Sequence, residues 1–194
     1  GEDAKYFPDD VFKQVAAQGY RGLKCEEQYG GSCSGGPDNA SEGYLADAVL
    51  LEELPACQSG GVAAGLWAHA GIALTPIWKF GTPEQKAKYL APGIKGEKLA
   101  ALAITEPGAG SDVANIQTKA EKVDGGWLLN GSKVFITNGV RAHTIVTAAK
   151  TTQDGGHRGM SFFIVERGEG IESSPLEKLG WHASDTAEIS YTDV

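Results

Sequence analysis

The stretch GEKLAALAI, residues 96–104, marks the point at which the pattern of the sequence changes. Within it, Leu99–Ile104 is a continuous run of apolar residues, which is typical of a buried strand. Before this stretch, apolar residues recur at helical spacing between helix start and stop signals. After it, short runs alternate between apolar and polar residues and are separated by turn-forming dipeptides. The change of period predicts helices in the first half and strands in the second.

The first half carries several helix signals. Ser41 is a candidate N-cap of a helix that ends at Pro55. We expect Leu45 and Val49 to belong to the apolar face of this helix and Asp47 to face water. The segment Thr82-Pro83-Glu84-Gln85 combines an N-cap, a proline at the first helical position and a capping box, so it predicts the start of a further helix.

The stretch Leu54–Trp78 contains no Asp, Glu, Lys or Arg and is long enough to span a bilayer. It also contains Pro55 and Pro76 together with several glycines, and it starts well inside the chain. We therefore expect a buried helix over roughly residues 60–74 and no transmembrane segment. His69, in the middle of this helix, is expected to be a core histidine with satisfied hydrogen bonds.

The second half is expected to form strands joined by tight turns. Asn130-Gly131 is a strong hairpin signal between residues 127–129 and residues 134–137. Further strands are predicted at residues 116–123, 144–149, 161–165 and 188–192. Helices followed by strands indicate an α+β fold and exclude a doubly wound sheet. We place the domain boundary at Gly96–Lys98, which gives a helical domain over residues 1–97 and a β domain over residues 98–194.

The composition excludes several classes of protein. Glycine accounts for 27 of 194 residues, well above the usual share of about 7%, but shows no collagen period. The net charge is −8 and neither half is basic, which argues against nucleic-acid binding. Cys25, Cys33 and Cys57 form no CxxC pair, and the histidines stand apart from one another, so we expect reduced intracellular cysteines and no metal site.

The most unusual segment is ITEPGAGSD, residues 104–112, a glycine-rich loop after the apolar run. It lacks the lysine of a P-loop, and no helix pattern follows it as in a dinucleotide-binding GxGxxG loop. Its backbone N–H groups are not covered by side chains and could bind an anion such as a pyrophosphate. Thr105 and Ser111 add hydroxyl donors. From the residues alone, an ordinary turn remains the alternative.

A second candidate site is Phe135-Ile136-Thr137-Asn138-Gly139. Phe135 precedes Thr137 by two residues and would share its face of a strand. The pair could cover a flat ring system and hydrogen-bond its edge. From spacing alone, an ordinary core strand remains the alternative.

Both segments also carry a resemblance to a known family. ALAITEPGAGSD, residues 101–112, resembles the most distinctive motif of the acyl-CoA dehydrogenase flavoproteins, and NGSKVFITN, residues 130–138, resembles their second motif at the usual distance. Four further stretches are similar to the same family in the same order, namely residues 27–31, 80–86, 159–166 and 178–186. The resemblance therefore covers essentially the whole chain.

The resemblance implies an N-terminal helical domain followed by an antiparallel, β-barrel-like middle domain. It implies an oxidoreductase of fatty acid β-oxidation that uses FAD to convert an acyl-CoA to the trans-2-enoyl-CoA and passes the electrons to an electron-transfer flavoprotein. Family members are homotetramers whose general-base glutamate lies in a C-terminal helical domain that this chain lacks. No catalytic residue is therefore expected here, and the chain alone is expected to be inactive. The implied compartment is the bacterial cytoplasm or the mitochondrial matrix.

By motif match, the resemblance also implies the residues that bind ligands. Thr105 and Thr137 would hydrogen-bond the flavin ring system, and Ser111 would also touch the acyl-CoA. Phe135 stands where the family often has tryptophan, which keeps the stacking face but loses the indole N–H donor. Glu106, the carboxylate of the loop, is expected to have no catalytic role. The full set of expected FAD contacts is Leu102, Ile104, Thr105, Gly110, Ser111, Phe135, Ile136 and Thr137.

Two other functions are compatible with the same motifs. An acyl-CoA oxidase shares the architecture but transfers its electrons to oxygen. The sequence of residues 106–111 disfavours an oxidase, because that family tends to depart from it. A truncated, non-catalytic homologue could bind flavin or a partner protein without turnover. A reading frame that continues for another ~150–200 residues would disfavour the truncated homologue.

Overall fold

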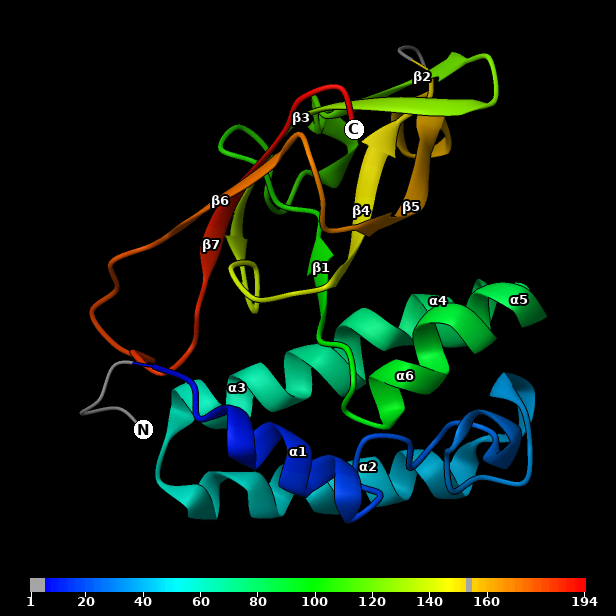
Figure 1. The fold of residues 1–194 in the computed structure, drawn as a ribbon, viewed down its shortest axis with the longest axis vertical. Coiled ribbons are helices and arrows are strands. Elements are labelled where there is room, and N and C mark those ends of the chain that lie inside the picture. Colours follow the sequence, from blue (N-terminus) through cyan, green and yellow to red (C-terminus); the bar gives the residue numbers. More distant parts are fainter. Residues whose placement is uncertain (1–5, 153–154) are drawn as a thin grey trace. The chain divides into compact units, whose positions relative to one another are not determined.

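The computed structural model describes residues 6–152 and 155–194, which divide into two compact units (Figure 1). The first unit, here called the helical unit, contains the chain up to Ala100 together with Lys178–Ser184. The second, here called the sheet unit, contains Ala101–Glu177 and Asp185–Val194. The α-helices precede the strands along the chain, so the predicted α+β class is confirmed.

In the described residues, the helical unit is built from three long helices and several short ones; one of the three is α2. The π-helical segments η4 and η5 interrupt the other two, which run over Gly60–Phe80 and over residues 83–94. The capping box predicted at Thr82–Gln85 is confirmed. The helices are α1 (Asp9–Ala17), η1 (Glu27–Tyr29), η2 (Pro37–Asn39), α2 (Ser41–Glu53), η3 (Leu54–Cys57), α3 (Gly60–Trp67), η4 (Ala68–Ala73), α4 (Leu74–Phe80), α5 (Pro83–Gln85), η5 (Lys86–Leu90) and α6 (Ala91–Ile94).

The helix Gly60–Phe80 supplies much of the core of the helical unit. Its buried side includes Leu66, Leu74, Ile77 and Trp78. By length and composition, it is also the one helix in the described part of the chain that could cross a membrane. This is weak evidence for a membrane span, because the core helix of a soluble protein passes the same test. The predicted buried helix is therefore present and extends further than expected.

His69 is the fully buried titratable group of this helix. Its Nδ1 accepts a hydrogen bond from the Ala100 amide at 2.9 Å, so the ring proton lies on Nε2, which faces the Gly93 carbonyl oxygen at 3.0 Å. Burial, reinforced by the charge of Arg21, lowers the pKa of His69 to about 3. His69 is a neutral core histidine with both ring nitrogens bonded, as the sequence predicted.

We expect the buried His69 to make stability fall in acid. In the unfolded chain, His69 binds a proton near pH 6.5, whereas in the folded chain His69 does so only near pH 3. Between these values the unfolded state binds more protons, so the free energy of unfolding decreases as the pH falls. His69→Gln should weaken this dependence, measured as urea midpoints at about pH 5 and about pH 7. Exposed His157→Gln is the control, and equal acid sensitivity in both variants would contradict the prediction.

The helix α2 differs from its prediction. Ser41 is its first helical residue and not its N-cap. Asp47, expected in water, is buried and lies 3.1 Å from the Nζ of Lys24. Leu45 and Val49, expected in the core, are 69% and 61% exposed. A buried lysine without a partner is costly, and the ion pair with Lys24 accounts for the burial of Asp47. The other charged residues of α2, Glu42, Glu52 and Glu53, are exposed.

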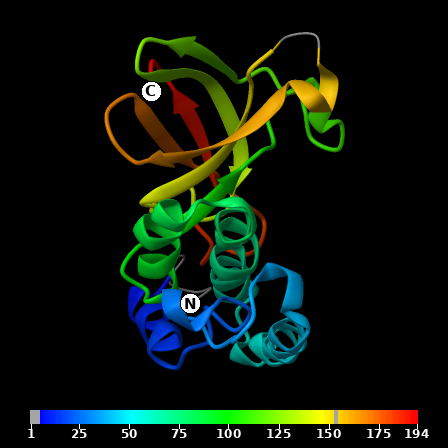
Figure 2. The same cartoon turned by 90° about the vertical axis from the view of Figure 1, so that its right-hand side faces the viewer.

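In the described residues, seven strands form a curled sheet in the order β1-β4-β2-β3-β7-β6, with β5 paired to β4 (Figures 1 and 2). The pairing of β2 with β4 is parallel, at Lys119 and Lys150, whereas β2–β3, β3–β7, β4–β5 and β6–β7 are antiparallel as predicted. β6 was not predicted. The strands are β1 (Ala100–Ala103), β2 (Lys119–Val123), β3 (Gly126–Ile136), β4 (Thr144–Lys150), β5 (Met160–Glu166), β6 (Ile171–Pro175) and β7 (Ala187–Tyr191).

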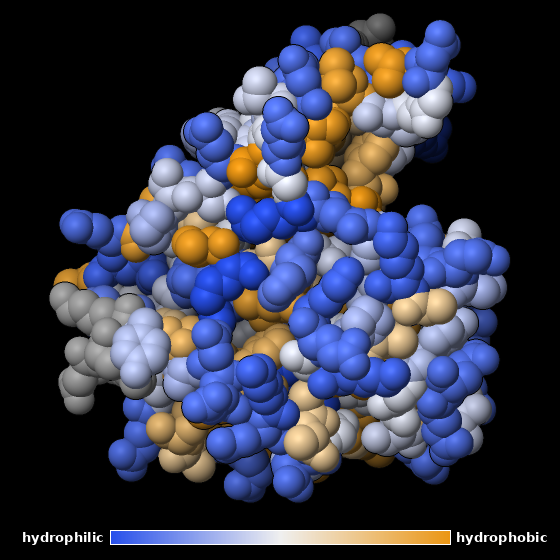
Figure 3. Space-filling model, in the orientation of Figure 1, coloured by the Kyte–Doolittle hydropathy of each residue, from blue (hydrophilic) through white to orange (hydrophobic). Residues whose placement is uncertain are grey.

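The inner faces of these strands form the core of the sheet unit. Alanines of β1, β2 and β4 pack together with larger side chains of β3, β4, β5 and β7. Some large apolar side chains remain outside this core: hydrophobic atoms reach the surface over the sheet unit (Figure 3), and Phe162 is 54% exposed. The buried core residues include Ala101, Ala103, Ala120, Leu129, Ile136, Ile145, Ala149, Val165, Ile189 and Tyr191.

The hairpin predicted at Asn130-Gly131 is wrong, because β3 runs through these residues without a turn. The strand changes partner here: Asn130 pairs with Lys119 of β2, whereas Gly131 pairs with Tyr191 of β7. Gly131 has a φ of +148°, and a Cβ atom on it would lie 2.6 Å from the Cα of Thr118. Glycine is therefore required where two backbones approach closely at a bend in the sheet.

Candidate functional site

The two segments singled out from the sequence lie side by side in the sheet unit. β1 leads into the glycine-rich loop, and the Thr105 carbonyl oxygen of this loop accepts a hydrogen bond from the Val134 amide of β3 at 2.9 Å. The structure thus brings the loop and the end of β3 together, although they are separated in sequence. Seven of the eight expected FAD contacts belong to these two segments, and the eighth, Leu102, lies in β1 just before the loop.

The loop begins with a tight turn. Glu106 and Ala109 exchange two backbone hydrogen bonds, at 2.9 and 3.1 Å, with Pro107 and Gly108 between them. In the described part of the chain, the amides of Gly108 and Gly110 donate to no partner. A Cβ atom built on either glycine would meet no atom within 4 Å. Unpaired amides beside open space fit an anionic group such as a pyrophosphate.

A buried ion pair ties this loop to β3. Lys133 of β3 is fully buried, and its Nζ donates to Glu106 Oε1 at 2.8 Å and to the Ile104 carbonyl oxygen at 2.9 Å. Glu106 is 6% exposed. Its carboxylate also accepts hydrogen bonds from the amides of Gln117 and Thr118. Both ends of the pair are therefore satisfied by hydrogen bonds as well as by charge.

These contacts keep Glu106 ionised. Burial raises the pKa of Glu106, but the hydrogen bonds from Lys133, Thr118 and Gln117 outweigh it and hold the pKa below its usual value. Burial lowers the pKa of Lys133, and the adjacent carboxylate opposes this shift. The direct contact at 2.8 Å keeps both groups charged at neutral pH. A carboxylate engaged in this way is a poor proton acceptor, which agrees with the expectation that Glu106 has no catalytic role.

Phe135 has an unusual backbone conformation. The register of β3 against β7 shifts between Lys133 and Ile136, and Phe135 has a φ of +60°, which bulky residues rarely adopt. Its side chain is 66% exposed, whereas Val134 and Ile136 are buried. A bulge can re-aim a side chain, and strained backbone of this kind concentrates at functional sites. The bulge turns the Phe135 ring outward, where it could face a flat ligand.

The other expected contact residues differ in how they could reach a ligand. Gly110 and Ser111 are exposed, and Thr105 and Thr137 are half-buried, so part of each residue is accessible. Ile136 is buried in the sheet core, which leaves its backbone as the part that could touch a ligand. Leu102 and Ile104 are half-buried. The role of Lys133 was not predicted, although a lysine beside apolar positions of a predicted strand can indicate a buried ion pair.

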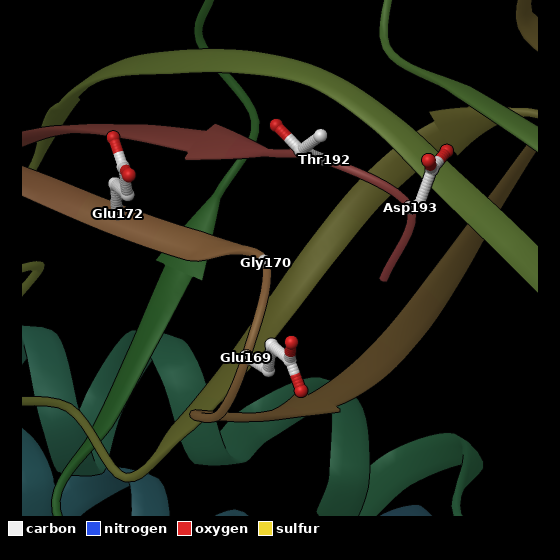
Figure 4. A pocket seen from close by; sticks show the side chains of 5 residues that line it. All are labelled: Glu169, Gly170, Glu172, Thr192 and Asp193. Carbon is white, nitrogen blue, oxygen red and sulfur yellow. The ribbon is translucent and has the colours of Figure 1, made fainter.

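An open pocket elsewhere in the sheet unit does not fit an anionic ligand. Glu169, Gly170, Glu172, Thr192 and Asp193 line it (Figure 4). The three carboxylates lie apart and do not converge, and their charge would repel phosphate groups. Within residues 6–152 and 155–194, no group of three or more His, Cys, Asp and Glu side chains could hold a metal ion.

Family models match the chain from end to end. The acyl-CoA dehydrogenase N-terminal domain matches residues 1–97, and the acyl-CoA dehydrogenase middle domain matches residues 101–194. The chain belongs to the acyl-CoA dehydrogenase family. The glycine-rich loop and the end of β3 thus both lie in the acyl-CoA dehydrogenase middle domain.

Curated members of the acyl-CoA dehydrogenase family are similar along the chain. The mitochondrial isovaleryl-CoA dehydrogenase of Arabidopsis thaliana is 41% identical over 95% of this chain and 44% of its own length. The short-chain specific acyl-CoA dehydrogenase of Megasphaera elsdenii is 40% identical over 97% of this chain and 48% of its own length. The chain thus spans about half the length of the curated relatives it matches.

Solved structures share the fold. Butyryl-CoA dehydrogenase from Megasphaera elsdenii has a TM-score of 0.90 and 38% identity over 100% of this chain and 50% of that one. A structure described as an electron transferring flavoprotein of Acidaminococcus fermentans has a TM-score of 0.89 and 36% identity over 99% and 49%. An FAD complex of PigA has a TM-score of 0.85 and 34% identity over 99% and 49%. The predicted acyl-CoA dehydrogenase fold is confirmed.

Proposed function

We propose that the protein containing this chain is an FAD-dependent acyl-CoA dehydrogenase. It would convert an acyl-CoA thioester to the trans-2-enoyl-CoA and pass the electrons to an electron-transfer flavoprotein. The observation that carries this proposal is the pairing of the glycine-rich loop, which has unpaired amides, with the end of β3, where the Phe135 ring is turned outward. The names of the relatives support an acyl-CoA substrate, and the FAD complex of PigA supports the cofactor.

We propose that the chain forms two domains, residues 1–97 and residues 98–194, and that the second domain holds the FAD and acyl-CoA contacts. In the second, the amides of Gly108 and Gly110 and the hydroxyl of Ser111 would hold the FAD pyrophosphate. The hydroxyls of Thr105 and Thr137 would bond the edge of the flavin ring, and Phe135 would cover its face. Ser111 would also touch the acyl-CoA. When bound, the flavin supplies the hydride acceptor of the reaction.

We expect the α-proton of the substrate to be taken by a carboxylate outside residues 1–194. Glu106 is ionised and engaged with Lys133. The motif match assigns no catalytic position to any other carboxylate of residues 1–194. A missing general base lowers the rate of proton transfer by about 10²–10⁴-fold, so the chain alone is expected to be inactive. The complete protein would be a homotetramer in the bacterial cytoplasm or the mitochondrial matrix, in keeping with bacterial and mitochondrial relatives.

The test is anaerobic mixing of the complete, FAD-loaded protein with acyl-CoA substrates of several chain lengths. We expect the visible flavin absorbance to bleach and to return when electron-transfer flavoprotein is added. Fast return with oxygen alone would indicate an oxidase instead. No bleaching with any acyl-CoA would contradict the proposed reaction and favour a non-catalytic homologue.

A further inference from the structure

We propose that Arg167 is a positioning residue for the flavin contacts, acting through the turn that follows Thr137. This inference rests on the proposed function, because it takes Thr137 and Phe135 as flavin contacts. Arg167 lies just after β5 and belongs to no stretch that sequence analysis assigned to the cofactor.

The turn in question spans residues 138–142 and directly continues the site strand. Asn138 has a φ of +65°, and its carbonyl oxygen accepts hydrogen bonds from the amides of Arg141 and Ala142 at 3.2 and 2.9 Å. The Gly139 amide donates to the Ile136 carbonyl oxygen at 3.0 Å. Along the chain, Thr137 lies between the bulge at Phe135 and this turn, so the position of the turn would affect the position of Thr137.

Arg167 fastens this turn with its whole guanidinium group. Nε donates to the Ala142 carbonyl oxygen at 2.7 Å, Nη2 donates to the Gly139 carbonyl oxygen, and Nη1 donates to Ser173 Oγ at 3.0 Å. Gly139 and Ala142 are both buried. Without the guanidinium, their carbonyl oxygens would lose these donors where water does not readily replace them.

Charged groups also hold the turn over residues 138–142 in place. Asp185 holds the turn through Arg141, accepting from its amide at 3.1 Å and from its Nη2 at 3.2 Å. Burial lowers the pKa of Arg167, and the nearby Tyr191 and Asp185 oppose this shift. Arg167 therefore remains a charged clamp on the turn. Lysine would be a poor substitute, because one ammonium group cannot reproduce three donors in a planar fork.

The experiment uses the complete FAD-loaded protein with Arg167→Met, which keeps an apolar stem, and Arg167→Lys, which keeps the charge. We expect Arg167→Met to raise the FAD dissociation constant about 3- to 30-fold and to change the flavin reduction potential and visible spectrum. For the FAD dissociation constant and the reduction potential, Arg167→Lys should give values between those of Arg167→Met and wild type. If Arg167→Met does not fold, the comparison of Arg167→Lys with wild type tests the proposal. Exposed Arg158→Met is the control and should match wild type.

Thr137→Ala separates the two proposals. If Thr137→Ala changes the potential and spectrum while the Arg167 variants lower only the melting temperature, Arg167 is merely structural and the inference is overturned. If Thr137→Ala leaves affinity, potential and spectrum as in wild type, the proposed flavin placement fails and the role of Arg167 fails with it. Changes in the same direction for Thr137→Ala and Arg167→Met support both.

Discussion

Lys133→Met is expected to destabilise the protein by about 3–5 kcal/mol and to remove measurable FAD binding. The variant would leave the Glu106 carboxylate buried without its cation. It would also free the Ile104 carbonyl oxygen that Lys133 holds at the start of the glycine-rich loop. Urea unfolding and FAD titration measure the two effects. Lys122→Met, a change of an exposed strand lysine, should leave both unchanged.

The double variant Glu106→Gln/Lys133→Met tests whether the buried charge causes this loss. It leaves no unpaired charge, so part of the lost stability should return. The pKa of Glu106 is lowered in the folded state, so its stabilisation is present above the unfolded pKa and is lost as the pH falls through the folded value. The double variant should lack this acid-dependent part. A double variant less stable than Lys133→Met would contradict the ion-pair explanation.

Gly110→Val is expected to weaken FAD binding by about 100-fold while leaving stability unchanged. A Cβ atom at this position meets no protein atom within 4 Å, and no positive φ strains a larger residue. The added side chain would instead fill the space beside the loop amides where the cofactor phosphates are proposed to lie. FAD titration and urea unfolding of the complete protein measure both quantities.

Gly126→Val provides a matched control. A Cβ atom on Gly126, at the start of β3, likewise meets nothing within 4 Å, and its φ is not positive. It belongs to neither site segment, so FAD affinity should match wild type. If Gly110→Val binds FAD as tightly as Gly126→Val, the loop does not cradle the cofactor.

Local signals predicted much of the fold and the candidate site. The change of period at residues 96–104 gave the α+β class, and the Thr82–Gln85 capping box was read from four residues. The glycine-rich loop and the Phe135 segment were found as motifs, and their adjacency follows from the pairing of the loop with β3. Each of these features depends mainly on residues that are close in sequence.

Features set by distant residues could not be predicted. Asp47 is buried because Lys24 needs a counter-charge, and Asn130-Gly131 bends a strand because β2 and β7 pair on either side of it. The roles of Lys133 and Arg167 were not predicted, because their partners are distant in sequence. The partners of Lys133 lie 27 to 29 residues away, and those of Arg167 lie 6 to 28 residues away. A strand pattern shows that a polar side chain is near the core, but not which group will satisfy it.

The most direct test of the proposed cofactor site is a crystal structure of the complete protein with FAD bound. We expect the flavin ring against Phe135, the Thr105 and Thr137 hydroxyls or amides within hydrogen-bond distance of its edge, and the pyrophosphate at the amides of residues 108–111. FAD bound elsewhere, with these two segments free of it, would contradict the assignment.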